Sequence, residues 1–557
     1  MRQVVLISGR ICTGKSGLGR RLKDEFGYRV IRTSETLAQV ARERGLATDR
    51  MSLQALGDVM DNETNHRWVL DTVERHLSSL PKTAPVVVDN IRTARQLEHF
   101  RRNHNWIIVH AHLYAPKLEL ERRFHKKNTE RGATETYSDA DLLKNESDIT
   151  SFMNDADVRI NTGRSDGRDT LVRVAARLGL YSPPDVRCVD VLVGGQYGSE
   201  GKGHVAAYLA RDYDVLLRVG GPNAGHTVSS ASGVYTYHQL PSGARDSHAK
   251  LLLGPGMTLR VDRLLDEIAE CGVTRERLFI DPQAMIIEPE DVEREKELVA
   301  KIASTGQGGG AAAARRILNR KPGAVRLARD IPELRPFVGT APLYRGSTTR
   351  QLEFAYREGQ SILLEGTQGS GLSLYHGSYP YVTSRDTNVA GCLAEAGISP
   401  SRVRRILMVV RPTPIRVSNP DGDGTSGGLK HEVTFEEVAK SAELDPTEVK
   451  NLEKTSTTKR DRRVGWFEWE QFRQACALNA PTDIVLTFAD YFNAKNQNAR
   501  RFEQLTQETI RFIEELERVA QAPVSLINTR FPRESGEKID LRTVIDRRNW
   551  TARRRAM

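Results

Sequence analysis

Two stretches of the chain repeat one local pattern, in which an apolar run leads into a glycine-rich turn and then into a helix. In the first, Val4–Ser8 precedes Gly9–Ser16, and in the second, Val189–Val193 precedes Gly194–Gly203. A short apolar run next to glycine is typical of a buried strand, and a glycine-rich turn that opens a helix presents backbone N–H groups to an anion. Each stretch therefore predicts a strand, a phosphate-binding loop and a helix at the start of its own α/β domain.

A proline pair separates the two patterns, in the segment Tyr181–Asp185. Consecutive prolines cannot continue a helix and donate no backbone hydrogen bond. We place the domain boundary there, which gives a first domain of residues 1–184 and a second of residues 185–557. Within the second, the stretch 306–310 predicts a loop that opens a helix, and the apolar spacing over 503–520 predicts a surface helix.

Composition narrows the class of protein. Charged residues make up 28% and hydrophobic residues 39% of the 557 residues, which is typical of a globular protein. No apolar run approaches the ~20 residues that a membrane-spanning helix needs, and the first residues lead straight into a strand-like run, unlike a secretory signal. The five cysteines are scattered and lack metal-binding spacing. We therefore expect reduced thiols, a cytoplasmic location and no membrane partner.

The formal net charge is +10, and two classes of anionic partner compete to explain it. Nucleic acids bind lysine and arginine through their phosphates, and small polyanions such as nucleotides do the same. The arginine cluster at Arg547, Arg548 and residues 553–555 is interpreted as a solvated tail. Because no nucleic-acid-binding motif is present, we expect nucleotides rather than nucleic acid as partners.

The first glycine-rich turn matches the pattern G-x-x-x-x-G-K-[ST] through Gly9, Gly14, Lys15 and Ser16. In such a loop the backbone N–H groups hold phosphate oxygens, the lysine reaches the β- and γ-phosphates, and the hydroxyl ligates Mg²⁺. We therefore assign Lys15 to phosphate binding and Ser16 to the metal.

A second strand, Val86–Val88, ends in Asp89, whose carboxylate is expected to face this loop and either to hold Mg²⁺ through water or to activate an acceptor. The basic stretch Leu120–Lys127 is either a lid that clamps phosphate or a solvated helix face. Taken together, residues 1–180 resemble the nucleoside-monophosphate kinase-like P-loop family. The resemblance implies a three-layer α/β/α fold, and leaves open whether the domain is a kinase or a nucleotide sensor.

The second glycine-rich turn is followed by an ordered series of motifs. They are Val219–Thr227, Leu240–Gly243, Ser304–Gly308, Leu364–Gly369, His376–Ser384 and Thr457–Phe467. This series resembles the adenylosuccinate synthetase family along residues 188–530. The resemblance implies a mixed α/β fold, a homodimer, and ligation of L-aspartate to the 6-position of a purine nucleoside monophosphate. A nucleoside triphosphate and Mg²⁺ are the expected cofactors.

The implied chemistry has two steps. The purine 6-oxygen attacks the γ-phosphate of the triphosphate, and the aspartate amine then displaces phosphate from carbon 6. His226 matches the family's catalytic histidine between the 6-oxygen and the phosphoryl group, and imidazole titrates near neutral pH, which suits an acid there.

The remaining roles are carried over by position. Lys202 and the stretch Gly198, Glu200, Gly201 and Gly203, with Thr227 and Asp490, match triphosphate contacts. Gly225 matches the carbonyl that binds Mg²⁺. Asn223, Thr305, Gln368 and Thr383 match contacts to the substrate nucleotide, and Arg320 matches, loosely, an arginine that reaches a neighbouring subunit's substrate. Thr457, Thr458, Arg460 and Arg462 match the aspartate-binding loop, where a guanidinium fork suits a carboxylate.

Two positions depart from the family. Ser199 stands where the family has an aspartate that takes the proton from N1 of hypoxanthine and binds Mg²⁺, and a serine hydroxyl is no base near neutral pH without activation. The same change is characteristic of a phage-type branch, the 2-amino-2'-deoxyadenylosuccinate synthetases, which act on dGMP. Phe488 replaces the lysine of a guanine-reading Thr-Lys-x-Asp motif, so ATP or dATP is expected ahead of GTP as phosphoryl donor.

Three functions follow from these departures. The first, which the retained His226, Lys202 and Gln368 favour, is an active ligase for dGMP. The others are an ordinary ligase for IMP with GTP, and a nucleotide-binding regulator that does not ligate.

Overall fold

The computed structural model of the chain describes residues 1–130, 137, 153–230, 233–339, 346–418, 425–455, 460–530 and 543–549. The chain divides into two compact units, Met1–Ser182 and Pro183–Met557. Both are α/β units, which confirms the predicted fold class. Within the described residues, every helix is too short or too polar to cross a bilayer.

The N-terminal unit is built on five parallel strands in the order β2-β3-β1-β4-β5. The strands are β1 (Arg2–Ser8), β2 (Arg29–Ile31), β3 (Val86–Val88), β4 (Trp106–Tyr114) and β5 (Val158–Asn161). The helices are α1 (Lys15–Phe26), α2 (Thr33–Glu43), α3 (Arg50–Glu63), α4 (Trp68–Leu77), α5 (Ala94–Arg101), α6 (Lys117–Thr129) and α9 (Gly167–Arg177).

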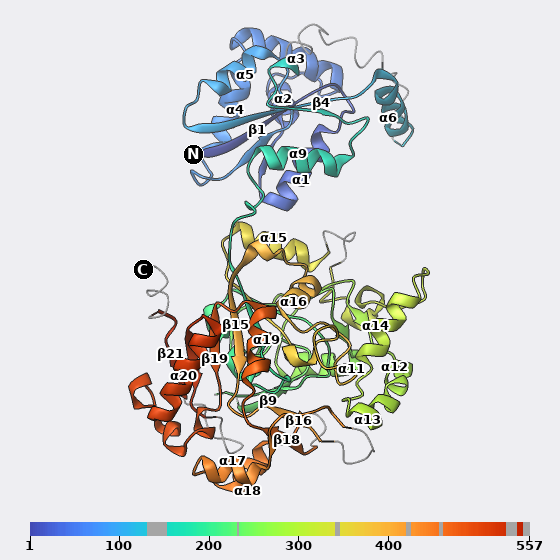
Figure 1. The fold of residues 1–557 in the computed structure, drawn as a ribbon. Helices are drawn as coiled ribbons and strands as arrows, with labels where there is room; N and C mark the ends of the chain where they lie inside the picture. Colours follow the sequence, from blue (N-terminus) through green and yellow to red (C-terminus); the bar gives the residue numbers. More distant parts are fainter. Residues whose placement is uncertain are drawn as a thin grey trace. The chain divides into compact units, whose positions relative to one another are not determined.

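Side chains of the central strand β1 alternate between two apolar cores. Val4 and Leu6 pack with residues of α2, α4 and α5, whereas Val5 and Ile7 pack with residues of α1 and α9. A strand buried on both faces is typical of a parallel sheet covered by helices on each side. The N-terminal unit therefore has the predicted three layers, with helices on both faces of its sheet (Figure 1).

The C-terminal unit contains a nine-stranded sheet in the order β12-β10-β7-β14-β6-β15-β19-β20-β21. All its pairings are parallel except that of β20 with β21, so the sheet is mixed. In chain order its strands are β6 (Val189–Gly194), β7 (Val215–Arg218), β10 (Lys250–Leu253), β12 (Leu278–Ile280), β14 (Ile362–Glu365), β15 (Val403–Val410), β19 (Asp483–Leu486), β20 (Val524–Asn528) and β21 (Val544–Asp546).

Small sheets surround this large one. They are the hairpin β8 (His226–Ser230) with β9 (Gly233–Tyr237), the pair β11 (Thr258–Leu259) with β13 (Met285–Ile286), and the trio β16 (Ile415–Val417), β18 (Arg462–Gly465) and β17 (Glu432–Val433). The helices are α10 (Lys202–Leu209), α11 (Val261–Glu270), α12 (Pro289–Arg294), α13 (Lys296–Ile302), α14 (Gly309–Leu318), α15 (Thr348–Arg357), α16 (Val389–Ala396), α17 (Phe435–Ser441), α18 (Pro446–Leu452), α19 (Trp469–Asn479) and α20 (Gln507–Ala520).

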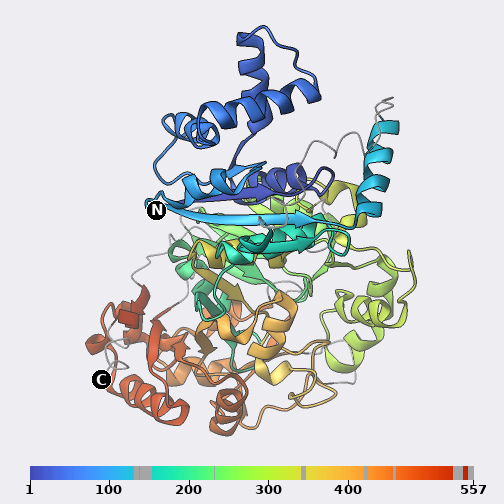
Figure 2. The same ribbon diagram turned by 90° about the horizontal axis from the view of Figure 1, so that it is seen from above.

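Two cores cover the faces of the large sheet. One face packs against α15, α16, α19 and α20, and the other packs against α10 and α11. In both views, the segment α12–α14 and the C-terminal strands β19–β21 lie toward opposite ends of this unit (Figures 1 and 2). Because the central strands are parallel, the loops at their carboxyl ends meet at one edge of the sheet, where ligands of such sheets bind.

The predicted elements are confirmed with small shifts in their ends. The stretch 306–310 opens α14, and the helix predicted over 503–520 begins at Gln507. Thr506 caps that helix, because its side chain accepts a hydrogen bond from the backbone N–H of Thr509. The preceding residues, Phe502–Gln504, form a 3₁₀ turn instead.

Strand β4 buries two histidines next to the first phosphate-binding loop. Ser8 Oγ lies 2.6 Å from His110 Nε2 and 2.8 Å from His112 Nδ1. Burial lowers the pKa of both imidazoles to about 4, aided by their mutual repulsion at His110 and by Lys15 at His112. Both histidines are therefore neutral in the folded protein near pH 7.

The first prediction is that the N-terminal unit loses stability as the pH falls from about 6.5 to about 4. In that window the unfolded chain binds protons at His110 and His112 and the folded unit does not. The free energy of unfolding therefore falls by up to about 3 kcal/mol per histidine. The stability of the N-terminal unit is measured by urea titration of the full chain at each pH, with hydrogen-exchange mass spectrometry of β1 and β4 peptides as the readout. His112→Gln should flatten the pH slope, whereas the exposed control His104→Gln should keep it; equal slopes in both would contradict the prediction.

Candidate functional site

The first glycine-rich loop, between β1 and α1, requires glycine at two positions. Gly9 and Gly14 have φ angles of 137° and 97°, and a Cβ on Gly9 would lie 2.0 Å from the carbonyl oxygen of Leu113. Lys15 Nζ donates to the carbonyls of Gly9 at 2.6 Å and of Arg10 at 2.9 Å. The loop thus curves around the N-terminus of α1 with its lysine folded against it. A glycine-rich loop at a helix N-terminus is an arrangement that binds anions.

Asp89, a predicted site residue, is close enough to this loop to interact with the charge of Lys15. It follows β3, whose Val88 pairs with Leu6 of β1, and the Ile91 N–H donates to the carbonyl of Ile7 at 2.8 Å. Burial raises the pKa of the Asp89 carboxyl, against the opposing charge of Lys15. Ser16, the predicted metal ligand, is exposed at the first turn of α1.

A cavity of about 160 Å³ adjoins the same loop, lined by residues that include Thr13, Gly14, Leu18 and Arg123. Arg123 of α6 donates to Thr162 Oγ1 at 3.1 Å and to the Thr162 carbonyl at 2.6 Å. One arginine of the basic stretch therefore faces inward and fixes the loop after β5. His125, Lys126 and Lys127 of the same stretch are exposed.

The second glycine-rich loop, between β6 and α10, is organised around a buried carboxylate. Glu200 Oε1 accepts the backbone N–H groups of Gln196 at 2.9 Å and Gly198 at 2.8 Å, and Oε2 accepts Lys202 Nζ at 2.6 Å. Lys202 is 1% exposed and also donates to the Gly198 carbonyl at 3.1 Å. Gly198 and Gly201 have φ angles of 104° and 83°, which favour glycine. The loop is therefore closed by an internal ion pair.

His226 begins β8 and is buried. Its Nδ1 lies 2.5 Å from Glu365 Oε1, so Nδ1 carries the proton and donates to the carboxylate. Its Nε2 is buried and has no hydrogen-bond partner in the described part of the chain. Ser242 also donates to Glu365, through Oγ at 2.6 Å and its backbone N–H at 2.7 Å.

The charges around His226 set its protonation. Burial would raise the pKa of Glu365, but Arg218 and His226 outweigh it and hold that pKa at about 2. Burial, together with Arg218, lowers the pKa of His226 to about 4. The imidazole is therefore neutral near pH 7 and presents a bare Nε2 lone pair until negative charge comes near it.

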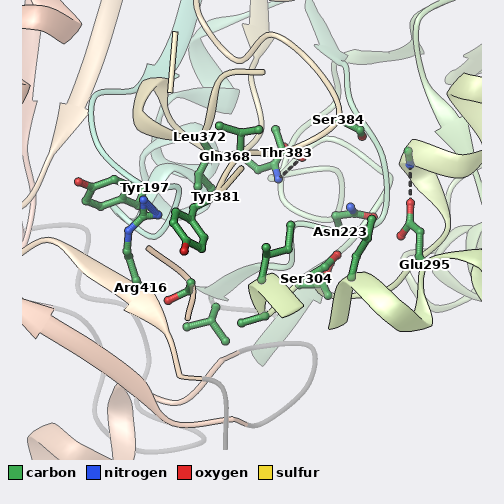
Figure 3. A pocket seen from close by; sticks show the side chains of 18 of the residues that line it. Tyr197, Asn223, Glu295, Ser304, Gln368, Leu372, Tyr381, Thr383, Ser384 and Arg416 are labelled. Atoms are coloured by element: carbon green, nitrogen blue, oxygen red, sulfur yellow. Dashed lines mark hydrogen bonds between the residues drawn. The ribbon is translucent and has the colours of Figure 1, made fainter. Parts of the chain in front are cut away.

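A cavity of about 400 Å³ opens at the carboxyl edge of the large sheet (Figure 3). Six predicted site residues line it: Ser199, Asn223, Thr305, Gln368, Thr383 and Arg462. Gln368 has a φ of 65° and donates through Nε2 to Thr383 Oγ1 at 2.9 Å, so these two side chains share one wall. The motif series thus converges from distant parts of the sequence on one cavity.

Sequence reasoning missed several residues of this wall. Arg416 of β16 stacks on Tyr197, with its guanidinium carbon 3.9 Å from the ring centre. Glu295 caps α14, because its carboxylate accepts the N–H groups of Gly308 and Gly310 at 2.7 Å each. Tyr197 could have been identified from the sequence, because it is an aromatic side chain within the glycine-rich turn. The charged residues around Glu295 gave no indication of a site.

Two arginines, Arg462 in the cavity wall and Arg460 two residues before it, have N–H groups without an acceptor within the described ranges. The Nε of Arg462 and the Nη1 of Arg460 are buried without a hydrogen-bond partner among the residues that the structure describes. A buried guanidinium N–H without an acceptor is costly, and a carboxylate or phosphate supplies the matching acceptors. Thr457 and Thr458, predicted for the same loop, lie outside the described residues.

Other predicted residues lie away from the cavity wall. Thr227 is exposed and its Oγ1 lies 2.9 Å from Thr236 Oγ1 on β9, on the face of β8 opposite His226. Arg320 is exposed just after the end of α14, and Gly225 lies in the turn before β8. Asp490 is buried in the 3₁₀ turn Ala489–Tyr491, with Gln497 Nε2 at 3.4 Å from its Oδ2.

Comparison with protein families matches residues 191–330 and 329–496 to the family described as adenylosuccinate synthetase, and residues 5–144 to the one described as AAA domain. The adenylosuccinate synthetase of Methanocaldococcus jannaschii is 35% identical over 360 residues, covering 63% of this chain and 96% of that protein. That of Pyrococcus sp. strain ST700 is 34% identical over 367 residues, covering 64% and 98%.

Two solved structures match the same region. The succinoaminodeoxyadenylate synthetase of cyanophage S-2L, bound to dGMP and to dATP as an energy donor, is 28% identical with a TM-score of 0.52, over 65% of this chain and 96% of that chain. The adenylosuccinate synthetase of Plasmodium falciparum is 20% identical with a TM-score of 0.52, over 65% and 99%, and supports the fold.

The second prediction concerns Gly203, the second residue of α10, which packs against His226. A Cβ there would lie 2.5 Å from His226 Cβ, so Gly203→Ala must displace the histidine and should cost about 1–3 kcal/mol of stability. Gly428→Ala is the matched control, because a Cβ at Gly428 meets no atom within 4 Å. Urea denaturation of both variants measures the difference, and equal stabilities would show that His226 is not held by this contact.

Proposed function

The chain belongs to the adenylosuccinate synthetase family, and on that premise we propose that its C-terminal unit ligates L-aspartate to carbon 6 of the guanine of dGMP. The family joins aspartate to a purine nucleoside monophosphate with a nucleoside triphosphate and Mg²⁺. The observation that carries the choice of dGMP is Ser199, which lies in the cavity wall where the family has an aspartate.

Ser199 suits guanine for steric and electrostatic reasons. Guanine carries a 2-amino group beside N1, in the region that the longer aspartate would occupy. The shorter serine leaves room there, and its hydroxyl oxygen can accept a hydrogen bond from that amino group. The cyanophage enzyme, which is 28% identical to this chain and was solved with dGMP, supports the same substrate.

His226 is proposed to act at the 6-oxygen. In the first step the 6-oxygen forms a bond to the γ-phosphorus, the bond to the β-phosphate breaks, and the N1 proton of guanine passes to water. A phosphoryl group brought to Nε2 adds negative charge, which raises the pKa of His226 and favours imidazolium where charge develops. Glu365 accepts from Nδ1 throughout, so it orients the ring and offsets that positive charge. In the second step the aspartate amine bonds to carbon 6 and inorganic phosphate leaves with the 6-oxygen.

Arg460 and Arg462 are proposed to hold the aspartate. Both have a buried N–H group without an acceptor among the residues described, Arg462 lines the cavity, and each guanidinium fork matches a carboxylate. Asn223, Thr305, Gln368 and Thr383 are proposed to contact the monophosphate nucleotide. Thr457 and Thr458 remain predictions for the aspartate site.

The triphosphate is proposed to lie along the second glycine-rich loop, with ATP or dATP as donor ahead of GTP. Phe488 cannot make the polar contact that a lysine makes to guanine, although Asp490 is kept. The Mg²⁺ of the family would meet neutral oxygens here, the Gly225 carbonyl and the Ser199 hydroxyl. Since Mg²⁺ is held mainly by carboxylates, water and substrate phosphates, these donors fit an ion carried largely by the triphosphate, whose charge it would neutralise.

A homodimer is proposed to complete the site. Ile317 and Leu318, at the end of α14, are 64% and 79% exposed. Apolar side chains so exposed beside Arg320 suit the surface of a second copy, toward which that arginine would extend.

Residues 1–182 are proposed to phosphorylate a nucleoside monophosphate. The loop Gly9–Ser16, the flanking Asp89 and the adjoining cavity provide a phosphate cradle, a carboxylate and a space beside them. The alternative is a domain that binds nucleotide without transferring phosphate.

The third prediction is that full-length protein with ATP, Mg²⁺ and aspartate forms a succinylated product from dGMP in preference to IMP. Chromatography with mass detection across a panel of purine monophosphates, each with ATP, dATP and GTP, measures it. An ordinary adenylosuccinate synthetase, which the names of the archaeal relatives favour, would use IMP alone. Tight nucleotide binding without any product would favour a regulator.

The residue behind this preference is tested by Ser199→Asp. The added carboxylate should lower kcat/KM for dGMP at least about tenfold more than for IMP, the order of discrimination that a steric change in a substrate pocket gives. Ser426→Asp, the same change at another serine of the cavity wall, is the control and should not discriminate between the purines. Equal effects of Ser199→Asp on both substrates would count against the steric argument.

The fourth prediction is that Lys15→Ala removes phosphotransfer by the N-terminal unit and leaves ligation unchanged. Lys15 is the cation of the first loop, and the ligase residues lie in the other unit. Monophosphate kinase activity is measured with labelled ATP, and ligation in the same samples. A Lys15→Ala variant with unchanged phosphotransfer rates would falsify the kinase proposal.

A further inference from the structure

The buried carboxylate of Glu453 joins side chains that serve different parts of the C-terminal site. It is 2% exposed and accepts hydrogen bonds from Arg411, from Arg462 Nη1 at 3.0 Å, and from the Tyr491 hydroxyl at 2.9 Å. Burial would raise the pKa of Glu453, but Arg411 and Arg462 outweigh it and hold that pKa at about 2. One carboxylate thus fixes two guanidinium groups and a phenol.

The first arm of this network leads to the phosphate loop. Arg411 follows β15 and is 1% exposed, and its Nη1 donates to the Ser199 carbonyl at 3.2 Å. Its backbone N–H and carbonyl are bonded by the amide of Gln196, at 3.0 Å each. Arg411 therefore contacts both the start and the middle of the loop that is proposed to bind triphosphate.

Arg411 also reaches the segment proposed to face the donor base. Its guanidinium carbon lies 4.0 Å above the ring centre of Phe488 and 5.4 Å from that of Tyr491. Phe488 has a φ of 53°, so its backbone is held in a conformation that is uncommon for a bulky residue. The stacked arginine is a contact that keeps the ring in place.

The second arm leads to the arginines proposed for aspartate. Arg462 lies in the cavity wall and donates to Glu453 through Nη1, while its Nε has no partner in the described residues. The backbone N–H of Thr455 donates to the Arg460 carbonyl at 2.9 Å, and the Arg460 N–H donates to Thr455 Oγ1 at 2.8 Å. Glu453 therefore lies two residues before the pair of hydrogen bonds that joins Thr455 to Arg460, the first of the arginines proposed for aspartate.

The charges of the network do not cancel. Among the groups that this network joins by hydrogen bonds, Glu453 supplies one negative charge, Arg411 and Arg462 supply two positive ones, and Tyr491 stays a neutral donor because burial raises its pKa. Two further acids act on it from outside: Glu200, which is already paired with Lys202, acts on Arg411, and Asp490 acts on Tyr491. A buried excess of positive charge is costly until an anion reaches it. A carboxylate at the unused Nε of Arg462 would remove that excess and draw Arg462 toward the ligand.

We infer that Glu453 is a positioning residue that couples the binding of aspartate to the arrangement of the triphosphate loop. A carboxylate bound at Arg462 changes how firmly Glu453 is shared between Arg462 and Arg411. The strength of the ion pair between Glu453 and Arg411 in turn determines how firmly Arg411 holds the Ser199 carbonyl and the Phe488 ring. The inference rests on the proposed ligase function, and it predicts that each of the two ligands tightens the binding of the other.

The large sheet offers a matched control with the same chemistry. Asp190 of β6 is 2% exposed and accepts from Arg404 Nε at 2.9 Å and from the Tyr213 hydroxyl at 2.6 Å. Asp190 lies near the start of β6, whereas the proposed triphosphate loop follows the end of that strand. Tyr213→Phe therefore removes the same phenol–carboxylate bond as Tyr491→Phe without touching the site.

The fifth prediction concerns Tyr491→Phe and Glu453→Gln, made in full-length protein that carries Lys15→Ala so that the N-terminal loop does not bind the probe. The β,γ-imido analogue of ATP is titrated by calorimetry with and without saturating L-aspartate. In the parent protein aspartate should tighten the analogue at least about fivefold. Tyr491→Phe should reduce that factor and raise the KM for aspartate about tenfold with kcat changed less than about twofold, the effect of one hydrogen bond to a charged group.

Glu453→Gln should bring the coupling factor to about one. If that variant unfolds, Tyr491→Phe decides, since it leaves all the charges in place. A coupling factor unchanged in Tyr491→Phe, or lowered equally in Tyr213→Phe, would overturn the inference, as would a parent protein in which aspartate has no effect on the analogue. A parent protein that shows the coupling but ligates no purine monophosphate would refute the proposed function alone.

Discussion

The ion pair of Glu200 with Lys202 is the interaction on which the C-terminal site depends. Burying a carboxylate costs several kcal/mol unless it is paired and hydrogen-bonded, and Glu200 meets that cost with one ammonium and two backbone N–H groups. The neighbouring chain leaves no room for more atoms, because a Cβ on Gly194 or Gly369 would lie 2.7 Å and 2.6 Å from its oxygens. Lys202 thus shapes the loop that is proposed to bind triphosphate.

What the sequence could predict depends on how local the cause is. The loop Gly9–Ser16 was predictable because its geometry follows from glycines a few residues apart. The bond between Gln196 and Arg411 was not, since 215 residues separate them and only the pairing of β6 with β15 brings them together. The same holds for Glu453, whose two arginines lie far apart in the sequence, one just after β15 and the other on β18.

Charge placement distinguishes the roles of the buried acids. Glu200 is neutralised within its own loop, and Glu365 is shared by His226, Ser242 and Arg218. Glu453 alone among these serves two cations with one charge. A fully neutralised acid holds structure in place whether or not ligand is bound, whereas an under-neutralised cluster responds to the charge of a ligand. The carboxylate substrate is therefore expected to matter most at the Glu453 end of the site.

The residue proposed to select the purine is separate from those that hold its loop. Glu200, Gln196 and Arg411 fix the loop through backbone groups, including the carbonyl of Ser199, so none of these contacts uses the Ser199 side chain. An aspartate can thus be exchanged for serine at that position without removing a bond that shapes the loop. Such an exchange changes the size and charge of the cavity wall while Lys202 and His226 stay in place. A change of substrate by one residue is consistent with this separation, because the fold of the loop does not depend on the side chain that is proposed to face the base.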